Sequence, residues 1–95
     1  MLSKAERAPD EVIAEVTLRE LLSRVLGLAE TQVSGFAEST ALFGSLPEFD
    51  SMAVASFLTA LEERLGILIE DDDVDAEDFA SFGSLLAFVD RIQSR

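Results

Sequence analysis

Three stretches of this chain repeat their apolar residues at intervals of three or four, the spacing that places side chains on one face of an α-helix. They cover residues 12–28, 51–65 and 81–92, and the helix breakers Pro47 and Gly66 lie between them. Each apolar face needs a partner to bury it, and no second strand-like run is available. The sequence therefore predicts an all-α fold: a small antiparallel bundle of three main helices with one short helical turn.

Polar and glycine residues predict where these helices begin and end. Asp10 and Asp50 are expected to cap the first and second helices, because short polar side chains accept hydrogen bonds from the free N–H groups of a first turn. Either Ser81 or Ser84 can cap the last helix in the same way. Gly66 is expected to stop the second helix, since glycine adopts the left-handed conformation that ends many helices.

The connection over residues 31–49 is long for a compact domain, and such loops are usually functional or carry short structure of their own. Phe36, Leu42 and Phe43 are apolar enough to anchor it. We expect an ordered loop pinned to the core at Leu42 and Phe43, with one helical turn near residues 40–43.

The connection after the second helix has an apolar and an acidic part. Residues 67–69 are β-branched or leucine, and we expect an extended segment that fills the core. Residues 70–78 are mostly Asp and Glu, and a weak helical turn is expected near residues 75–79. The whole chain has 19 acidic and 7 basic residues, a formal net charge of −12. That field repels nucleic acids and membrane surfaces and favours proteins with basic docking patches.

A chain of 95 residues is expected to form one domain. Residues 1–9 are predicted to be a flexible leader and residues 10–93 the folded domain. Neither a signal-peptide pattern nor an apolar run of membrane-spanning length is present. A monomeric cytoplasmic protein is therefore expected, with no membrane insertion.

The residue inventory argues against an enzyme. A nucleophilic serine such as Ser51 needs a base, and the chain has no His and no Cys. Its only lysine, Lys4, lies in the expected leader. No catalytic residue is predicted.

A metal site is not predicted either. Asp71, Asp73 and Asp75 match the first spacings of a calcium-binding loop. Ala76 replaces the glycine required at the sixth position, and Phe82 replaces the bidentate carboxylate at the twelfth. A solvated acidic turn explains the segment better.

Ser51 stands at the predicted start of the second helix, and two interpretations of it are open on local chemistry. The free N–H groups and the positive end of the helix dipole would favour a phosphodiester attached there. Alternatively, Asp50 and Ser51 form an ordinary capping pair.

Three segments together favour Ser51 as an attachment site over an ordinary capping pair. Residues 49–52 (Phe-Asp-Ser-Met), 61–67 (Leu-Glu-Glu-Arg-Leu-Gly-Ile) and 79–85 (Phe-Ala-Ser-Phe-Gly-Ser-Leu) resemble the acyl carrier protein family, a resemblance that covers roughly residues 10–92. It implies that Ser51 receives 4′-phosphopantetheine from coenzyme A through a phosphopantetheinyl transferase. The thiol of that arm would carry acyl groups as thioesters, loaded by a ligase or an acyltransferase.

The resemblance also implies roles for the surroundings of Ser51. Members dock partner enzymes through the second helix, and acyl chains can tuck beside it. The expected cap and partner-recognition residues are Asp50, Met52, Val54, Glu48, Glu62 and Glu63. The expected acyl cleft is lined by Phe57, Leu61 and Ile69, and a closed core would use the same residues.

The chain departs from the fatty-acid synthesis members on the exposed face of this helix. Ala53, Ser56 and Arg64 stand where those members are acidic, while Met52 and Val54 make the neighbourhood of Ser51 apolar. We therefore expect a carrier that serves partner enzymes of a specialised lipid, polyketide or modified-metabolite pathway. An aminoacyl or peptidyl carrier, and an unmodified acidic helical adaptor that binds a protein partner, remain the alternatives.

Overall fold

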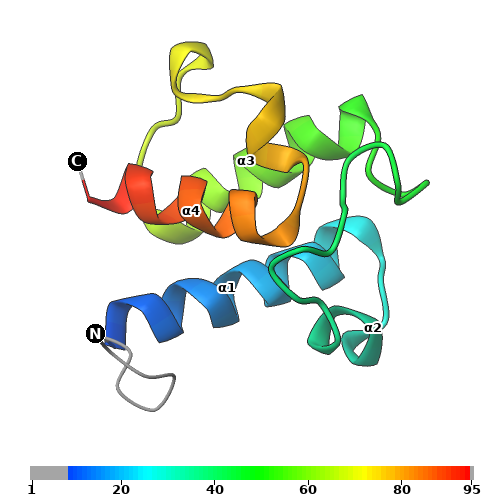
Figure 1. Ribbon diagram of the computed structural model, residues 1–95. Coiled ribbons are helices and arrows are strands. Elements are labelled where there is room, and N and C mark those ends of the chain that lie inside the picture. Colours follow the sequence, from blue (N-terminus) through cyan, green and yellow to red (C-terminus); the bar gives the residue numbers. More distant parts are fainter. Residues whose placement is uncertain (1–8, 95) are drawn as a thin grey trace.

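The computed structural model describes residues 9–94, with side chains from Ile13 onward (Figure 1). Three long helices form the frame: α1 (Pro9–Leu26), α3 (Ser51–Leu65) and α4 (Phe82–Gln93). A short helix, α2 (Glu30–Ser34), and two 3-10 helices, η2 (Asp71–Asp73) and η3 (Ala76–Phe79), lie in the connections. Residues 9–94 contain no strand, and the predicted all-α fold is confirmed.

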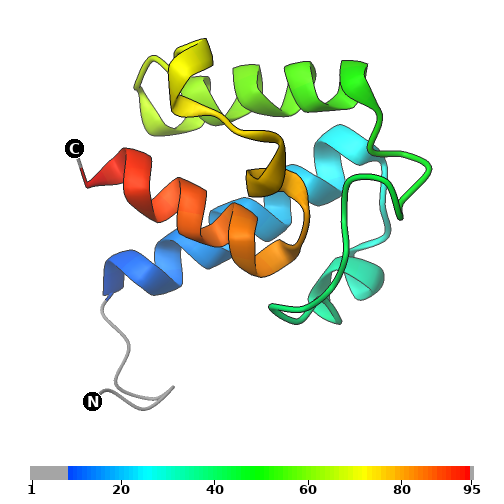
Figure 2. The ribbon, with the colours of Figure 1, turned by 45° about the horizontal axis from the view of Figure 1, so that its top comes forward.

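Helix α1 is the central element, because α2, α3 and α4 all pack against it. Figures 1 and 2 show α1 running in the opposite direction to both α3 and α4. The described chain measures 37 × 30 × 21 Å along its principal axes. Helices α3 and α4 therefore run in the same direction as each other, because the long connection over residues 66–81 carries the chain back to the starting end of α3.

The core is built from the predicted apolar faces and from further apolar residues outside them, several of which come from the connections, such as Val33, Phe49 and Phe79. Leu18, Leu21 and Leu22 of α1 are completely buried, as expected from their spacing. In α4, Phe88 is equally buried, although it stands beside the predicted stripe. The buried phenylalanines of the core are Phe36, Phe49, Phe57, Phe79, Phe82 and Phe88.

Helix α3 begins and ends where the sequence predicts. The Asp50 carboxylate accepts a hydrogen bond from the backbone N–H of Ala53 at 2.8 Å. Gly66 adopts a left-handed conformation (φ 66°) and its N–H donates to the Glu62 carbonyl at 2.8 Å. The Asp50 cap and the left-handed Gly66 set where this helix starts and where it ends.

The predicted start of α1 is wrong by a short distance. The helix begins at Pro9, so Asp10 lies inside it and is not the N-cap. Proline is favoured at the first helical position, because its ring fixes φ at a helical value and its missing N–H needs no partner. Pro9 was the last residue of the expected leader, and the rest of that leader lies outside the described residues.

The loop over residues 31–49 is ordered, but its helical turn is not where we expected it. The short helix is α2, whereas residues 40–42 are extended and a further turn follows at residues 43–45, where the N–H groups of Ser45 and Leu46 donate to the Leu42 carbonyl. Four backbone hydrogen bonds tie residues 38–43 to the segment that enters α4: Leu42 N–H to Ala80 O, Phe43 N–H to Phe79 O, Phe82 N–H to Thr40 O, and Gly83 N–H to Glu38 O. Their donor–acceptor distances are 2.9 to 3.0 Å.

Only two of the three predicted loop anchors are buried. Phe36 and Leu42 lie in the core, whereas the Phe43 side chain is 44% exposed. Successive side chains of an extended segment point to opposite sides, so burying Leu42 turns Phe43 outward.

Arginine 19 holds the first part of this loop. Its guanidinium donates to the carbonyl oxygens of Val33 and Phe36 and lies over the Phe82 ring, 4.5 Å from the centroid. The structure shows that it joins α1, α2 and the start of α4.

The segment after α3 is extended, as predicted, but only partly fills the core. Ile67 and Ile69 pack against the core, while Leu68 between them is 69% exposed. The alternation of an extended chain again explains the difference. The acidic residues that follow form η2 and η3, and the expected turn near residues 75–79 is confirmed.

Candidate functional site

Ser51 is the first residue of α3, and its side chain is exposed. Capping is performed by Asp50, whose carboxylate holds the Ala53 N–H. Within residues 9–94 the Ser51 hydroxyl makes no hydrogen bond. The two residues therefore do not share the capping role. Asp50 orders the helix start, and Ser51 presents a free hydroxyl to solvent.

A groove of about 250 Å³ opens beside this hydroxyl. One wall is α3 and the other is the segment that joins η2 to η3. The lining residues are Phe43, Ser51, Val54, Val74, Asp75, Ala76 and Phe79. Asp75 is the only ionisable residue among them, so the groove is apolar along most of its surface.

The floor of the groove is aromatic. The Phe79 ring is 3% exposed and packs against Phe49, Phe57 and Phe88, with centroids 5.7, 6.3 and 6.3 Å away. Phe49 and Phe57 also contact each other at 6.2 Å. These rings close the interior of the bundle directly beneath the groove.

The three residues predicted to line an acyl cleft do not line this groove. Phe57 and Leu61 are fully buried in the core, and Ile69 does not line the opening. The groove lies one turn nearer to Ser51 and uses Val74, an apolar residue inside the acidic run. That single valine was the signal in the sequence that could have located it.

Arg91 of α4 holds the outer wall of the groove. Its guanidinium donates to the Asp78 carboxylate at 3.2 Å and to the Asp73 carbonyl at 3.4 Å. It also lies over the Phe88 ring, 5.3 Å from the centroid. These contacts span η2 and η3, so one side chain positions both ends of the segment that carries Val74 and Ala76.

The predicted recognition residues are placed in two groups. Met52 is 80% exposed and Val54 half-buried, both within one turn of Ser51. Glu48 and Glu63 are exposed.

Glu62, in contrast, is occupied within the fold. Its carboxylate accepts a hydrogen bond from the Ile69 N–H at 2.7 Å. Arg64 nearby forms an ion pair with Glu20 of α1. The second half of α3 thus uses its charges to hold neighbouring segments, and the exposed neighbourhood of Ser51 is mainly apolar.

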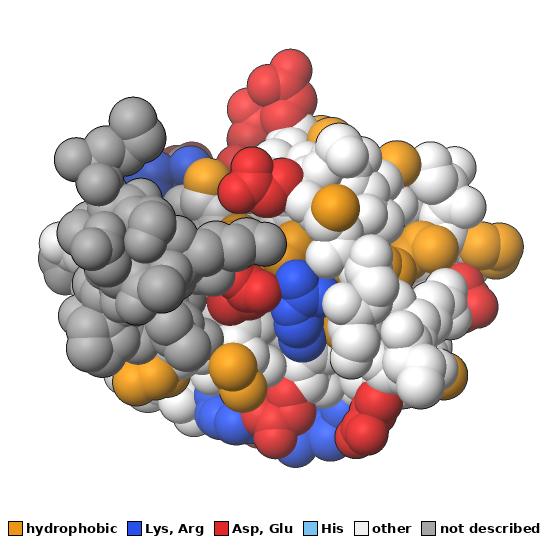
Figure 3. Space-filling model, turned by 60° about the horizontal axis from the view of Figure 1, so that its bottom comes forward, with side chains coloured by type: hydrophobic (Ala, Val, Ile, Leu, Met, Phe, Trp, Pro, Cys, Tyr) orange, Lys and Arg blue, Asp and Glu red, His pale blue; other side chains and the backbone are white. Residues whose placement is uncertain are grey.

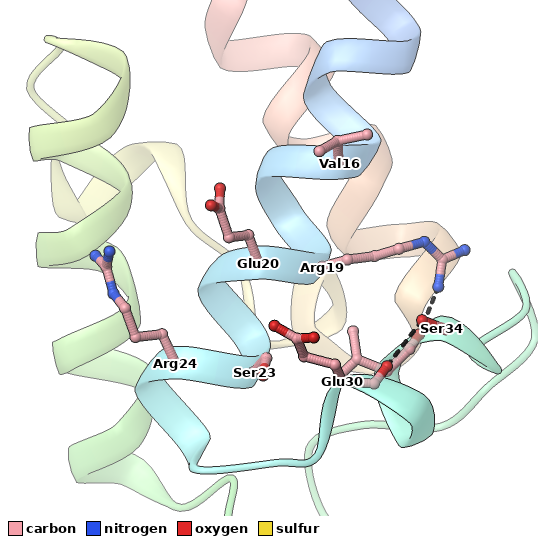
Figure 4. Close-up of a pocket in the computed structure, with 8 residues that line it drawn as sticks. Val16, Arg19, Glu20, Ser23, Arg24, Glu30 and Ser34 are labelled. Atoms are coloured by element: carbon pink, nitrogen blue, oxygen red, sulfur yellow. Dashed lines mark hydrogen bonds between the residues drawn. The ribbon is translucent and has the colours of Figure 1, made fainter.

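A larger hollow, of about 510 Å³, lies between α1 and α2, away from Ser51. Figure 3 shows acidic and basic side chains close together on this face, and Figure 4 shows Arg19 reaching from α1 to α2. Four of the polar side chains at this hollow, Arg19, Glu20, Ser23 and Ser34, have partners within the fold. The Ser23 hydroxyl donates to the Leu28 carbonyl at 2.7 Å, and the Ser34 hydroxyl donates to the Glu30 carbonyl at 2.8 Å. The Glu20 carboxylate forms an ion pair with Arg64. We therefore assign the functional site to the smaller groove beside Ser51.

Two further searches of the described residues bear on function. Among residues 9–94, no group of three or more metal-ligating side chains is placed to hold a metal ion. No helix in this part of the chain is long and apolar enough to cross a membrane.

Comparisons with known proteins agree with this geometry. A family model described as a phosphopantetheine attachment site matches residues 16–92. The chain is also similar to the solution NMR structure of a holo acyl carrier protein from Nitrosomonas europaea, with 39% sequence identity and a TM-score of 0.75. That match covers 86% of this chain and 96% of the other. No curated protein matches this sequence.

Proposed function

Because this chain belongs to the family of acyl carrier proteins with a phosphopantetheine attachment site, we propose that Ser51 is the residue that bears the arm. The observation that supports it best is the free, exposed Ser51 hydroxyl at the start of a helix whose cap is supplied by Asp50. The groove beside Ser51 gives the tethered group an apolar surface to rest on.

Membership of the family establishes the general role. The chain is a carrier and not a catalyst, and its cofactor is a covalently attached 4′-phosphopantetheine. When attached, this group supplies a terminal thiol on which acyl groups travel as thioesters. Carriers of this kind meet a modifying enzyme and a loading enzyme.

The chemistry at Ser51 is a phosphoryl transfer performed by a separate transferase. The Ser51 oxygen forms a bond to the phosphorus that carries pantetheine in coenzyme A. The pyrophosphate bond breaks, adenosine 3′,5′-bisphosphate leaves, and the hydroxyl proton passes to the transferase or to solvent. The residues of this chain contribute position: Asp50 orders the first turn, and the helix start favours the resulting phosphodiester.

Intact-mass measurement tests this assignment. Incubation with coenzyme A and a broad-specificity phosphopantetheinyl transferase is expected to add about 340 Da, a single covalent modification. Ser51→Ala is expected to abolish the gain. Ser56→Ala, which removes another exposed serine of α3, is the matched control and should be modified normally. An equal gain in Ser51→Ala would overturn the proposal, and an unmodified wild type would favour the adaptor.

We further propose that the partners belong to a specialised pathway and dock through apolar contact near Ser51. The support is Met52, the most exposed of the large apolar side chains in the described chain, together with half-buried Val54 and Phe43 at the groove. Exposed apolar side chains grouped at one place commonly mark a protein interaction site. Glu62 and Arg64 are engaged with Ile69 and Glu20, which leaves Glu48 and Glu63 as the carboxylates of this surface.

Met52→Glu compared with Ser56→Glu tests the docking mode, since both add one negative charge to an exposed position of α3. We expect Met52→Glu to slow modification or loading much more than Ser56→Glu. Equal effects would indicate that long-range charge governs docking, which would contradict apolar contact at Met52. A cytoplasmic location and a monomeric state stay predictions from the sequence.

A further inference from the structure

The sequence contains very few side chains that a mild oxidant can attack. It has no Cys, His, Trp or Tyr, and its two methionines are Met1 and Met52. Methionine and cysteine are the residues that oxidants convert reversibly in proteins, so residues 9–94 hold a single site of this kind. The Met52 side chain is 80% exposed, and its sulfur is therefore open to an oxidant dissolved in water.

The position of Met52 links this sulfur to the attachment of the arm. It follows Ser51 directly in the first turn of α3. Helical side chains lean towards the N-terminus of their helix, so the Met52 side chain leans towards the start of α3, where Ser51 lies. Ala55 and Ser56, the next residues along the same face, are small and exposed and give it little cover. A transferase that takes Ser51 into its active site therefore has to pass over Met52.

The fold does not depend on the Met52 side chain, which belongs neither to the buried core nor to the partly buried residues packed against it. The start of α3 is held instead by the Asp50 carboxylate, which accepts the Ala53 N–H at 2.8 Å. An oxygen atom added to the sulfur would therefore stay in water and leave the bundle intact. Beneath a docked protein the same oxygen would lose its water, which is unfavourable unless a new hydrogen bond replaces it.

We propose that Met52 is a modification site, at which oxidation of the thioether to the sulfoxide by hydrogen peroxide slows attachment of the arm to Ser51 without unfolding the chain. The O–O bond of the peroxide breaks, and one of its oxygens bonds to the sulfur. The sulfur loses two electrons to the peroxide, whose other oxygen leaves as water. The inference rests on the proposed attachment at Ser51 and on docking at Met52.

The modification is reversible, which separates it from damage to the protein. Methionine sulfoxide reductases remove the oxygen, one enzyme for each of the two sulfoxide epimers. The oxygen leaves as water, and the dithiol that supplies the two electrons becomes a disulfide.

The test uses the whole chain before the arm is attached, because the thiol of the arm would itself be oxidised. Hydrogen peroxide is added and then destroyed with catalase, and a peptide map measures sulfoxide at Met52 and Met1 separately. Coenzyme A and a broad-specificity phosphopantetheinyl transferase follow, and intact mass gives the rate of attachment. Full oxidation of Met52 is expected to slow attachment about tenfold, the effect of one polar group buried without a partner.

Two further measurements on the oxidised protein complete the expectation. Treatment with reductases for both epimers should restore the rate of attachment. The midpoint of thermal unfolding should move by no more than about 3 °C, as for other changes at exposed side chains.

Two variants locate the effect, and each is compared with its own rate before peroxide. Met52→Leu keeps an apolar side chain without sulfur, so peroxide should leave its rate unchanged. Met52→Leu combined with Ser56→Met moves the sulfur one turn along the exposed face of α3, and its oxidation should slow attachment by less than about twofold. Met1 is present in every variant and controls for oxidation outside the described residues.

Several results would overturn the proposal. They are an unchanged rate in wild type with Met52 fully oxidised, equal slowing in either variant, a loss of rate that the reductases do not restore, and a collapse of the thermal midpoint. Failure of the untreated protein to gain the arm is a separate result, seen before peroxide is added. It would contradict attachment at Ser51 itself, and this inference with it.

Discussion

The backbone N–H of Gly83 donates a hydrogen bond to the carbonyl oxygen of Glu38 at 2.9 Å, which draws the start of α4 close to the loop before α3. A Cβ atom added at Gly83 would lie 2.8 Å from that same oxygen. Its three nearest neighbours would be the carbonyl oxygen, the Cβ and the carbonyl carbon of Glu38, at 2.8, 3.1 and 3.3 Å, and none of these atoms can rotate away. This contact explains why a glycine stands in the first turn of α4, where its low helix propensity is otherwise a cost.

Gly83→Ala is therefore expected to destabilise the fold by about 1–3 kcal/mol, the usual cost of overpacking. Urea unfolding followed by circular dichroism measures it. Gly35→Ala is the control, because the nearest atom to its added Cβ is 3.5 Å away and its φ is ordinary. That variant should lie within about 1 kcal/mol of wild type. Equal losses in both variants would contradict the steric explanation.

Asp50→Ala removes the cap of α3 and should lower the free energy of unfolding by about 1 kcal/mol. Asp50→Asn keeps an oxygen in the same place and should lose much less. If Asp50 acts only as a cap, Asp50→Asn should also accept the phosphopantetheine arm at close to the wild-type rate. A large loss of modification in Asp50→Asn, with stability retained, would assign the carboxylate a direct role in docking.

Arg19→Met should destabilise the protein by about 1–3 kcal/mol, because the carbonyl oxygens of Val33 and Phe36 lose a charged donor. Arg24→Met removes the same charge from an exposed position of the same helix and should change stability by about 0.5 kcal/mol or less. Thermal or urea unfolding of the two variants gives the comparison. Similar losses in both would mean that charge alone, and not the contacts of Arg19, accounts for the effect.

Arg91→Gln is expected to act locally on the outer wall of the groove. The Arg91–Asp78 ion pair is more than half exposed on the arginine side, so its removal should cost the whole fold about 1 kcal/mol or less. Backbone amides of residues 74–80 should nevertheless exchange faster, because the hydrogen bonds from Arg91 to the Asp73 carbonyl and the Asp78 carboxylate are lost.

Asp90→Asn, which alters the neighbouring exposed charge, is the control and should leave this exchange unchanged. Added salt should raise the amide exchange rate of residues 74–80 in the wild type towards the rate in Arg91→Gln, because salt screens exposed ion pairs. Unaltered exchange in Arg91→Gln would show that η2 and η3 hold their positions without this side chain.

Elements with strong local signals were predictable from the sequence. Helix α3 runs from Ser51 to Leu65 as predicted, because Asp50 and Gly66 act on their immediate neighbours. Helix α2 was missed, since five residues are too few to show a period and its N-cap, Ala29, makes no side-chain hydrogen bond. Short elements of this kind form only because a distant side chain, here Arg19, holds the loop.

The groove beside Ser51 could not be located from the sequence, for the same physical reason. Phe57 and Leu61 belong to a regular apolar stripe, and a stripe does not reveal which of its members stay accessible. Accessibility depends on how residues far apart in the chain cover one another. Val74 and Phe79 come from the acidic connection, and Phe43 from the first loop. Only the folded chain brings them to Ser51.

The hydrogen bond from the Phe43 N–H to the Phe79 carbonyl joins two lining residues of the groove through their main chains. Such a bond does not depend on which side chain either residue carries. The depth and shape of the groove can therefore change by substitution at these positions while the loop stays attached. Evolution can therefore vary the apolar surface beside Ser51 without first finding a new way to fold the chain.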